Sequence, residues 1–185
     1  MRDNLIVYGS LINKKELFDV FDYVTENEII PIRLNGFKRV FNQETVWRKG
    51  SGKKIAVLNV VKSDNNWFNG ILVRGVNESY FRIIDKREEG YKRIKVDPAS
   101  IKFAYGISIK LEGQIWIYTG KEHKMRKDVS PIPSYLDICL EGTKEWGEGF
   151  YNDFLITTFL PNGLMLIDFL KMNPKFEQKI LVRIP

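Results

Sequence analysis

The sequence predicts an α+β fold, because segments of β character dominate before residue 120 and helical segments dominate after residue 130. Strands and helices segregated in this way are typical of α+β proteins, or of a small mixed β-barrel surrounded by helices, whereas regular alternation predicts a parallel sheet. The chain contains no internal repeat, low-complexity tract or Gly/Ser linker. Its 185 residues are therefore predicted to form a single domain, residues 1–185.

The composition is that of a globular chain able to bury a core. Hydrophobic residues make up 44% and aromatic residues 13%, which suffices without disulfides or metals. The one cysteine, Cys139, allows no intramolecular disulfide and indicates a reducing compartment. The N-terminal apolar run is too short for a signal peptide, and no run approaches the roughly 20 apolar residues of a membrane span. We therefore expect a cytoplasmic protein with no membrane partner.

The formal charge of +6 suggests an anionic ligand or attraction to nucleic acid. The basic residues are scattered, however, with short clusters at 121–127 and 48–54 in place of a continuous stripe. Nucleic-acid binding, supported otherwise only by aromatics such as Trp47 and Trp67, is therefore the weakest alternative, and we expect no nucleic-acid partner. The single histidine, His123, excludes multi-histidine metal sites, and no Cys/His cluster has zinc spacing. We expect neither metal nor cofactor.

The N-terminal part of the chain predicts one strand, one helix and several extended segments. Residues 4–8 are an apolar run that stops at Gly9, as in a buried strand. Residues 12–24 place apolar side chains on one face of a helix. Further extended segments are predicted at 28–33, 36–42, 54–61 and 70–76, with turn chemistry at 63–66.

A second helix is predicted to begin after Asn77, a good N-cap, and to end at about Arg87. Two strands follow it, at 91–96 and 113–118, and a Pro-containing turn occupies 97–100.

A Pro-rich turn at 130–134 breaks the chain before a third helix. Ser134 and Asp137 fit a capping box at its start, and it is expected to end near Gly142. Another helical stretch follows Gly149 and is expected to end at Pro161 and Gly163, which leaves 161–185 as a C-terminal extension without a predicted structure.

Three short segments could carry chemistry. The turn Tyr8-Gly9-Ser10-Leu11 joins a strand to a helix, and successive N–H groups at such a glycine turn can hold an anionic oxygen. Glu88 lies at a predicted helix end, where the dipole disfavours a carboxylate. Tyr135 lies on the first turn of a helix and could bind a ligand. Each segment also has a purely structural interpretation. The turn at 8–11 could be an ordinary strand-to-helix turn, Glu88 could belong to a solvated charged turn, and Tyr135 could be a core aromatic.

The order and spacing of these segments resemble the gamma-glutamylcyclotransferase superfamily, which includes ChaC-type glutathione-degrading enzymes and gamma-glutamylamine cyclotransferases. The resemblance spans roughly residues 4–160. Its most specific features are YGSL, then an acidic D-x-x-E-x-G-Y stretch, then P-S-Y on a helix. The matching segments are VYGSL at 7–11, GFKRVFN at 36–42, FNGILVRGV at 68–76, IIDKREEGYKRIKV at 83–96 and SPIPSYLDICLEGTKEWG at 130–147.

The resemblance implies a small mixed β-barrel with helices around it and the release of 5-oxoproline from a gamma-glutamyl small molecule. The catalytic glutamate of the family falls on Glu88, although a slip of one residue would move that role to Glu89. Its Tyr-Gly-Ser turn falls on Tyr8, Gly9 and Ser10, and the N–H groups of Gly9, Ser10 and Leu11 would hold the α-carboxylate or the developing oxyanion of the substrate. Its substrate-contacting tyrosine falls on Tyr135.

In the implied reaction the α-amine of the substrate attacks its own γ-carbonyl, so the enzyme needs no nucleophile, metal or cofactor. Glu88 would serve as the general acid and base. Arg33, Arg39 and Lys54 are candidates for binding a second carboxylate. The alternative function is a non-catalytic small-molecule-binding module on the same fold. The sequence predicts neither the leaving group nor the oligomeric state.

Overall fold

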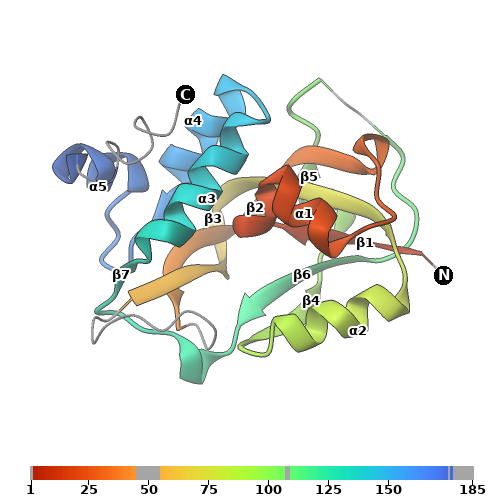
Figure 1. Ribbon diagram of the computed structural model, residues 1–185, viewed down its shortest axis with the longest axis horizontal. Coiled ribbons are helices and arrows are strands. Elements are labelled where there is room, and N and C mark those ends of the chain that lie inside the picture. Colours follow the sequence, from red (N-terminus) through yellow and green to blue (C-terminus); the bar gives the residue numbers. More distant parts are fainter. Residues whose placement is uncertain (1, 45–54, 107–108, 175, 177–185) are drawn as a thin grey trace.

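Two long antiparallel strands form the centre of the sheet in the computed structural model, which describes residues 2–44, 55–106, 109–174 and 176. The strands pair in the order β4-β6-β1-β3-β2-β5, with β7 on β3 and β8 on β2 (Figure 1). Their bounds are β1 Asp3–Val7, β2 Ile29–Gln43, β3 Ile55–Val76, β4 Tyr91–Lys95, β5 Ile101–Lys102, β6 Ile115–Gly120, β7 Ser130–Pro131 and β8 Thr158–Phe159.

The sheet is mixed, since β1 pairs antiparallel with β3 and parallel with β6. The predicted α+β class is thus confirmed. The closed barrel is not found: β4 and β5 are the two ends of the strand order, and no pairing among the described strands joins them. Closing a sheet requires its edge strands to reach each other, and β5 is only two residues long.

The centre of the sheet differs from the sequence-based expectation, because segments predicted as separate are continuous. Of the segments predicted at 28–33 and 36–42, all residues but Glu28 belong to the one strand β2, and the expected turn at 63–66 lies inside β3. The pairing runs from Asn35 opposite Trp67 to Phe37 opposite Lys62, so four residues of β3 oppose Gly36 alone. Gly36, with φ of 80°, accommodates this bulge, and the turn-forming residues bend β3 without ending it.

The second predicted helix, α2, is confirmed from its cap to its last residue. The Asn77 side chain accepts a hydrogen bond from the N–H of Tyr80, and the helix ends at Arg87. The predicted capping box of Ser134 and Asp137 is wrong. Helix α3 begins at Pro133 with no side-chain cap, because proline fits the first helical turn directly. The helices are α1 Lys14–Val20, α2 Glu78–Arg87, α3 Pro133–Lys144, α4 Glu148–Thr157 and α5 Leu166–Met172, with 3-10 turns η1 Ser10–Ile12, η2 Glu26–Glu28, η3 Pro98–Ser100 and η4 Glu122–Lys124.

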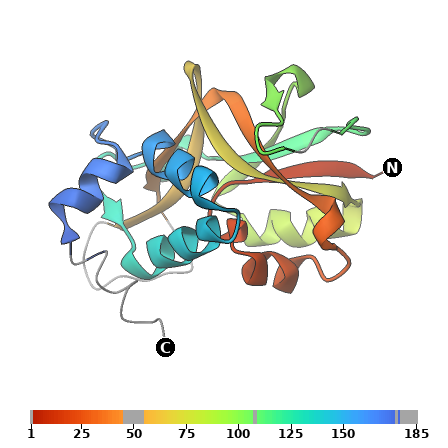
Figure 2. The ribbon, with the colours of Figure 1, turned by 90° about the horizontal axis from the view of Figure 1, so that it is seen from above.

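Helices α1, α2 and α3 lie on one side of the sheet, and α5 lies at the end remote from the N-terminus (Figures 1 and 2). The turn η1 after β1 contacts α3, and α4 packs on β3. A hydrophobic core fills the space between these layers, and its large fully buried side chains are Phe21, Phe41, Phe68, Phe81, Phe150 and Phe154.

Arg39 on β2 is fully buried and joins the sheet to α4 and β8. Its guanidinium donates to the backbone and side-chain oxygens of Asn69 at 2.6 and 2.9 Å and to the Thr158 hydroxyl at 2.7 Å. Longer bonds of 3.3 Å reach Phe154 and Thr157, and the Phe154 ring lies 3.9 Å from the guanidinium carbon. Burial lowers the pKa of Arg39 to about 9, which leaves it charged at pH 7.

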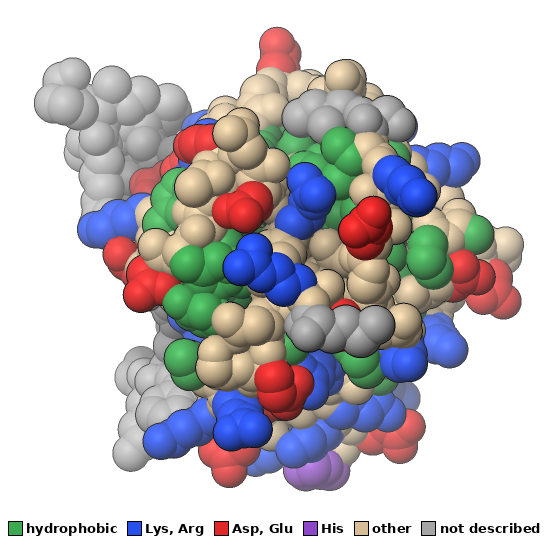
Figure 3. All heavy atoms as spheres, turned by 90° about the vertical axis from the view of Figure 1, so that its right-hand side faces the viewer, with side chains coloured by type: hydrophobic (Ala, Val, Ile, Leu, Met, Phe, Trp, Pro, Cys, Tyr) green, Lys and Arg blue, Asp and Glu red, His purple; other side chains and the backbone are tan. Residues whose placement is uncertain are grey.

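Basic and acidic side chains are interspersed over the face drawn in Figure 3. In the described ranges, no helix combines the length and apolarity needed to cross a membrane.

We expect Arg39→Met to lower the free energy of unfolding by roughly 3 kcal/mol, because hydrogen bonds to charged groups contribute about 1.5–3 kcal/mol net and methionine supplies none. Equilibrium urea unfolding at pH 7 measures the change. Lys62→Met, which removes a positive charge from an exposed position on β3, is the control and should stay within about 0.5 kcal/mol of the wild type. Equal stability of the two variants would contradict a structural role for Arg39.

Candidate functional site

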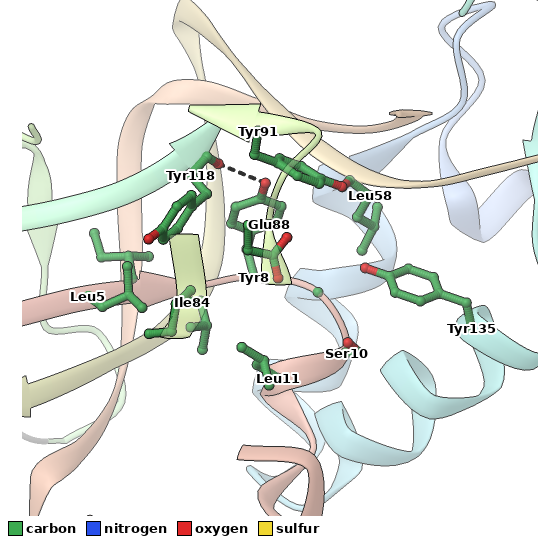
Figure 4. A pocket seen from close by; sticks show the side chains of 13 residues that line it. Leu5, Tyr8, Ser10, Leu11, Leu58, Ile84, Glu88, Tyr91, Tyr118 and Tyr135 are labelled. Atoms are coloured by element: carbon green, nitrogen blue, oxygen red, sulfur yellow. Dashed lines mark hydrogen bonds between the residues drawn. The ribbon is translucent and has the colours of Figure 1, made fainter. Parts of the chain in front are cut away.

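A pocket lies where the end of β1 meets the end of α2, the start of α3 and strand β6. It contains Glu88, Tyr135 and the turn at residues 8–11, which come from three distant segments of the sequence (Figure 4). The lining residues are Leu5, Ile6, Val7, Tyr8, Gly9, Ser10, Leu11, Leu58, Ile84, Glu88, Tyr91, Tyr118 and Tyr135.

Glu88 is the C-cap residue directly after α2, and its side chain points into the pocket (Figure 4). Its N–H donates to the Ile84 carbonyl at 2.7 Å, while its own carbonyl accepts from the N–H of Tyr91 at 2.8 Å. The side chain is 24% exposed. Burial raises the pKa of the Glu88 carboxyl, and the Arg87 guanidinium, 3.6 Å away, acts in the opposite direction.

The neighbouring Glu89 is exposed and does not line the pocket. Its backbone carbonyl accepts a hydrogen bond from Lys121, and its side chain belongs to the surface. Of the two adjacent carboxylates, the helix end thus directs only Glu88 inward.

Four tyrosines form much of the pocket wall. The Tyr8 hydroxyl donates to the Tyr118 carbonyl at 2.7 Å, and the Tyr91 hydroxyl donates to the Leu58 carbonyl at 2.6 Å. Burial raises the pKa of Tyr8, Tyr91 and Tyr118, and for Tyr8 the Glu88 charge acts in the same direction. These phenols are therefore neutral at pH 7.

Two of these tyrosines were missed by sequence reasoning. Tyr91 follows Glu88 within the quoted D-x-x-E-x-G-Y stretch, so its proximity could have been inferred from that spacing. Tyr118 lies on β6, and no local signal distinguishes it from other strand aromatics.

Tyr135 reaches the pocket from α3 by passing over the backbone of Gly9. A Cβ atom at position 9 would overlap the Tyr135 hydroxyl, so only glycine allows this approach. Burial raises the pKa of Tyr135, while a hydrogen bond from the Ser10 backbone lowers it. Farther along α3, a Cβ at Gly142 would similarly overlap the backbone of Asn13. Two glycines thus let α3 pack directly on the turn that follows β1.

The turn after β1 is closed by its own hydrogen bonds, from Ile12 to the Gly9 carbonyl at 3.0 Å and from Asn13 to the Ser10 carbonyl at 3.1 Å. The N–H groups of Ser10 and Leu11 precede these bonds, and that of Ser10 donates to the Tyr135 hydroxyl. They belong to residues that line the pocket.

Two of the basic residues proposed to bind a second carboxylate, Arg33 and Arg39, are not among the residues that line the pocket. Arg33 is paired with Asp153 at 2.7 Å and its guanidinium lies over the Trp67 ring at 4.5 Å. Arg39 is fully used in the buried network described above, and Lys54 lies outside the described residues.

Glu88 is the one charged side chain among the described lining residues. In that same part of the chain, no group of three or more His, Cys, Asp and Glu side chains could hold a metal ion.

Comparison with known proteins shows the fold but no sequence family. No protein-family model matches the chain, and no curated protein does. A solved gamma-glutamyl cyclotransferase matches 83% of this chain and 86% of its own, with a TM-score of 0.62 and 18% identity. An uncharacterized protein from Homo sapiens matches 82% and 85%, with a TM-score of 0.59 and 19% identity. A gamma-glutamyl cyclotransferase specific to glutathione from yeast matches 99% and 88%, with a TM-score of 0.50 and 17% identity. The chain therefore shares the fold of gamma-glutamyl cyclotransferase structures.

We expect Gly9→Ala to lower the free energy of unfolding by roughly 1–3 kcal/mol, because overpacking of this size forces neighbouring groups apart. Tyr135→Phe removes the oxygen that the added methyl would meet, and the next ring atom lies at an ordinary 3.5 Å. The double variant should recover most of the lost stability in urea unfolding, which is a coupling between the two positions. If the stability loss of the double variant equalled the sum of the two single losses, the contact between position 9 and the Tyr135 hydroxyl would be contradicted.

We also expect Glu88 to make stability depend on pH. Its folded pKa is raised, so the folded state binds this proton more tightly than the unfolded state does. The stability it contributes is present below the unfolded value of about 4.3 and is lost as pH rises through the folded pKa. Glu88→Gln should therefore gain stability relative to wild type between about pH 4 and pH 7 in urea titrations. Glu89→Gln, at an exposed position, should track the wild type, and parallel curves for all three proteins would refute a raised pKa.

Proposed function

We infer that this chain releases 5-oxoproline from a gamma-glutamyl amino acid, peptide or amine, with Glu88 as the general acid and base. The observation that carries this proposal is the inward-facing, partly desolvated Glu88 carboxyl, which shares one pocket with the turn after Tyr8 and with Tyr135. The fold shared with gamma-glutamyl cyclotransferase structures supports it.

The proposed reaction forms one bond and breaks one. The α-nitrogen of the substrate bonds to its own γ-carbonyl carbon and closes a five-membered lactam, and the bond from that carbon to the leaving nitrogen breaks. The attacking ammonium loses two protons as it becomes the lactam N–H, and the leaving nitrogen gains two protons as it departs as an ammonium, so the protons balance. No water is consumed and no redox step occurs, so one group able to take a proton and return it suffices.

Glu88 is suited to both proton transfers. As a carboxylate it accepts a proton from the ammonium, and as a carboxylic acid it donates that proton to the departing amine. Burial raises its pKa and so brings the two forms closer in free energy at working pH. Because Glu88 is the one charged side chain among the described lining residues, a positively charged α-ammonium would be drawn to it.

The rest of the pocket would fold the substrate into a reactive geometry. The N–H groups at the Gly9–Leu11 turn would hold an anionic oxygen, either the α-carboxylate or the oxyanion that develops on the γ-carbonyl. The neutral phenols of Tyr8, Tyr91 and Tyr135 line the same pocket as the carboxyl and would displace part of its water. Holding the amine against the γ-carbonyl in this way can supply a large share of the rate.

The test compares Glu88→Gln with Glu89→Gln, two variants that lose the same charge at adjacent positions. Each is incubated with glutathione, gamma-glutamyl amino acids and gamma-glutamyl-lysine, and 5-oxoproline is measured. We expect Glu88→Gln to lose on the order of 100- to 10,000-fold in turnover with its fold intact, and Glu89→Gln to keep near-wild-type rates. The wild-type rate should fall as pH decreases through the raised pKa of Glu88, because protonation removes the base.

Near-normal turnover by Glu88→Gln would rule out this carboxyl as the proton carrier. If the wild type released no 5-oxoproline from any of the three substrate classes but still bound them, the chain would be a small-molecule-binding module on the same fold.

A further inference from the structure

Helix α2 carries a second carboxylate one turn before Glu88. Residues three apart on a helix lie on the same face, so Asp85 and Glu88 are directed toward the same side of the molecule. Glu88 enters the pocket, whereas Asp85 accepts a hydrogen bond from the Tyr118 hydroxyl on β6. The proposed chemistry makes no use of Asp85.

Tyr118 links this second carboxylate to the pocket. Its residue is buried, with 6% exposure, and its backbone carbonyl accepts the hydrogen bond from the Tyr8 hydroxyl. Tyr8 in turn lies close enough to Glu88 for the carboxylate charge to raise its pKa. Hydrogen bonds therefore lead from Asp85 through Tyr118 to Tyr8, which lines the same pocket as Glu88.

The Asp85 carboxylate is held from its other side by Arg93 on β4. One guanidinium nitrogen forms an ion pair with Asp85 Oδ2 at 3.5 Å, while the Tyr118 hydroxyl donates to Oδ1, so each oxygen of this half-exposed carboxylate has its own partner. The Arg93 guanidinium lies over the rings of Phe81 at 4.2 Å and Trp116 at 5.1 Å, which restrict its position. Arg93 on the edge strand β4 thus restricts the position of the Asp85 carboxylate, and the Asp85 carboxylate restricts the position of the Tyr118 hydroxyl.

We propose that Asp85 is a positioning residue, which anchors the last turn of α2 to β6 and thereby keeps Glu88 directed into the pocket. Such an anchor is needed because both the helix dipole and the loss of hydration favour moving a carboxylate at this helix end into water. The kinetic consequence rests on the proposed function, whereas the effect on the Glu88 carboxyl itself does not.

The kinetic test uses four variants that separate hydrogen bonding from charge. Asp85→Ala and Tyr118→Phe each remove one partner, and we expect kcat to fall on the order of 10- to 100-fold in both, with a smaller change in KM. The double variant should lose no more than either single one, because both remove the same bond. Asp85→Asn lacks the charge but keeps an acceptor oxygen, so it should recover most of the lost kcat. Glu78→Gln, at an exposed position near the start of α2, should match the wild type.

The second measurement needs no turnover: the pKa of Glu88 is followed by carbon-13 NMR of its carboxyl group in the wild type and variants. If the anchor keeps Glu88 desolvated, its loss lets water reach the carboxyl, and the raised pKa should fall toward about 4.3. Tyr118→Phe decides this point, because it changes no charge, whereas Asp85→Ala also removes a nearby negative charge. Asp85→Asn controls for that charge.

Unchanged kcat and an unchanged Glu88 pKa in Tyr118→Phe and Asp85→Ala would overturn the inference. If Glu88→Gln abolished turnover while these variants behaved as wild type, the proposed function would stand and Asp85 would be an ordinary surface acid. If the wild type released no 5-oxoproline, the proposed function would fail, and the NMR titration alone would decide the role of Asp85. Should Asp85→Ala fail to fold, Tyr118→Phe and Asp85→Asn carry the same comparison.

Discussion

The close approach of α3 to the turn after β1 is the constraint on which the pocket depends. It is possible because Gly9 has no side chain where the Tyr135 hydroxyl lies and because Gly142 has none where the Asn13 backbone lies. A larger residue at position 142 would force the backbones of α3 and the turn apart, and one at position 9 would displace the Tyr135 hydroxyl, since packed interiors tolerate little added volume. Gly9 and Gly142, which are far apart in the sequence, therefore allow the close packing that shapes the site.

Arg39 and Glu88 are both removed from water, but their surroundings differ. The difference indicates a structural role for Arg39 and makes Glu88 the candidate for proton transfer. Arg39 is fully enclosed, and its guanidinium donates to neutral oxygens from β3, α4 and β8, so it acts as a fixed link between layers. Within the part of the chain that the structure describes, Glu88 forms one ion pair, with Arg87 at 3.6 Å, and its side chain faces a cavity. A carboxyl with a raised pKa in a pocket is a candidate for proton transfer, whereas a saturated buried arginine is not.

Local signals predicted the elements whose ends are determined by neighbouring residues. The Asn77 cap and the end of α2 at Arg87 depend on bonds within a few residues, and both were predicted correctly. The turn expected at 63–66 was wrong because pairing with β2 on both sides keeps β3 continuous and converts those residues into a bulge. The barrel implied by family resemblance was also wrong in its closure, because closure depends on contacts between edge strands that no local pattern encodes.

The sequence by itself determined the α+β class and selected Glu88, Tyr135 and the turn at 8–11 as candidates, because their residue types and spacing are visible along the chain. Only the tertiary structure decided that Glu88 points inward and Glu89 outward, that Tyr118 completes the wall, and that Arg39 is structural. The direction of a side chain at a helix end is set by how that helix packs on the sheet. Such packing joins residues a hundred positions apart, and no spacing along the chain records it.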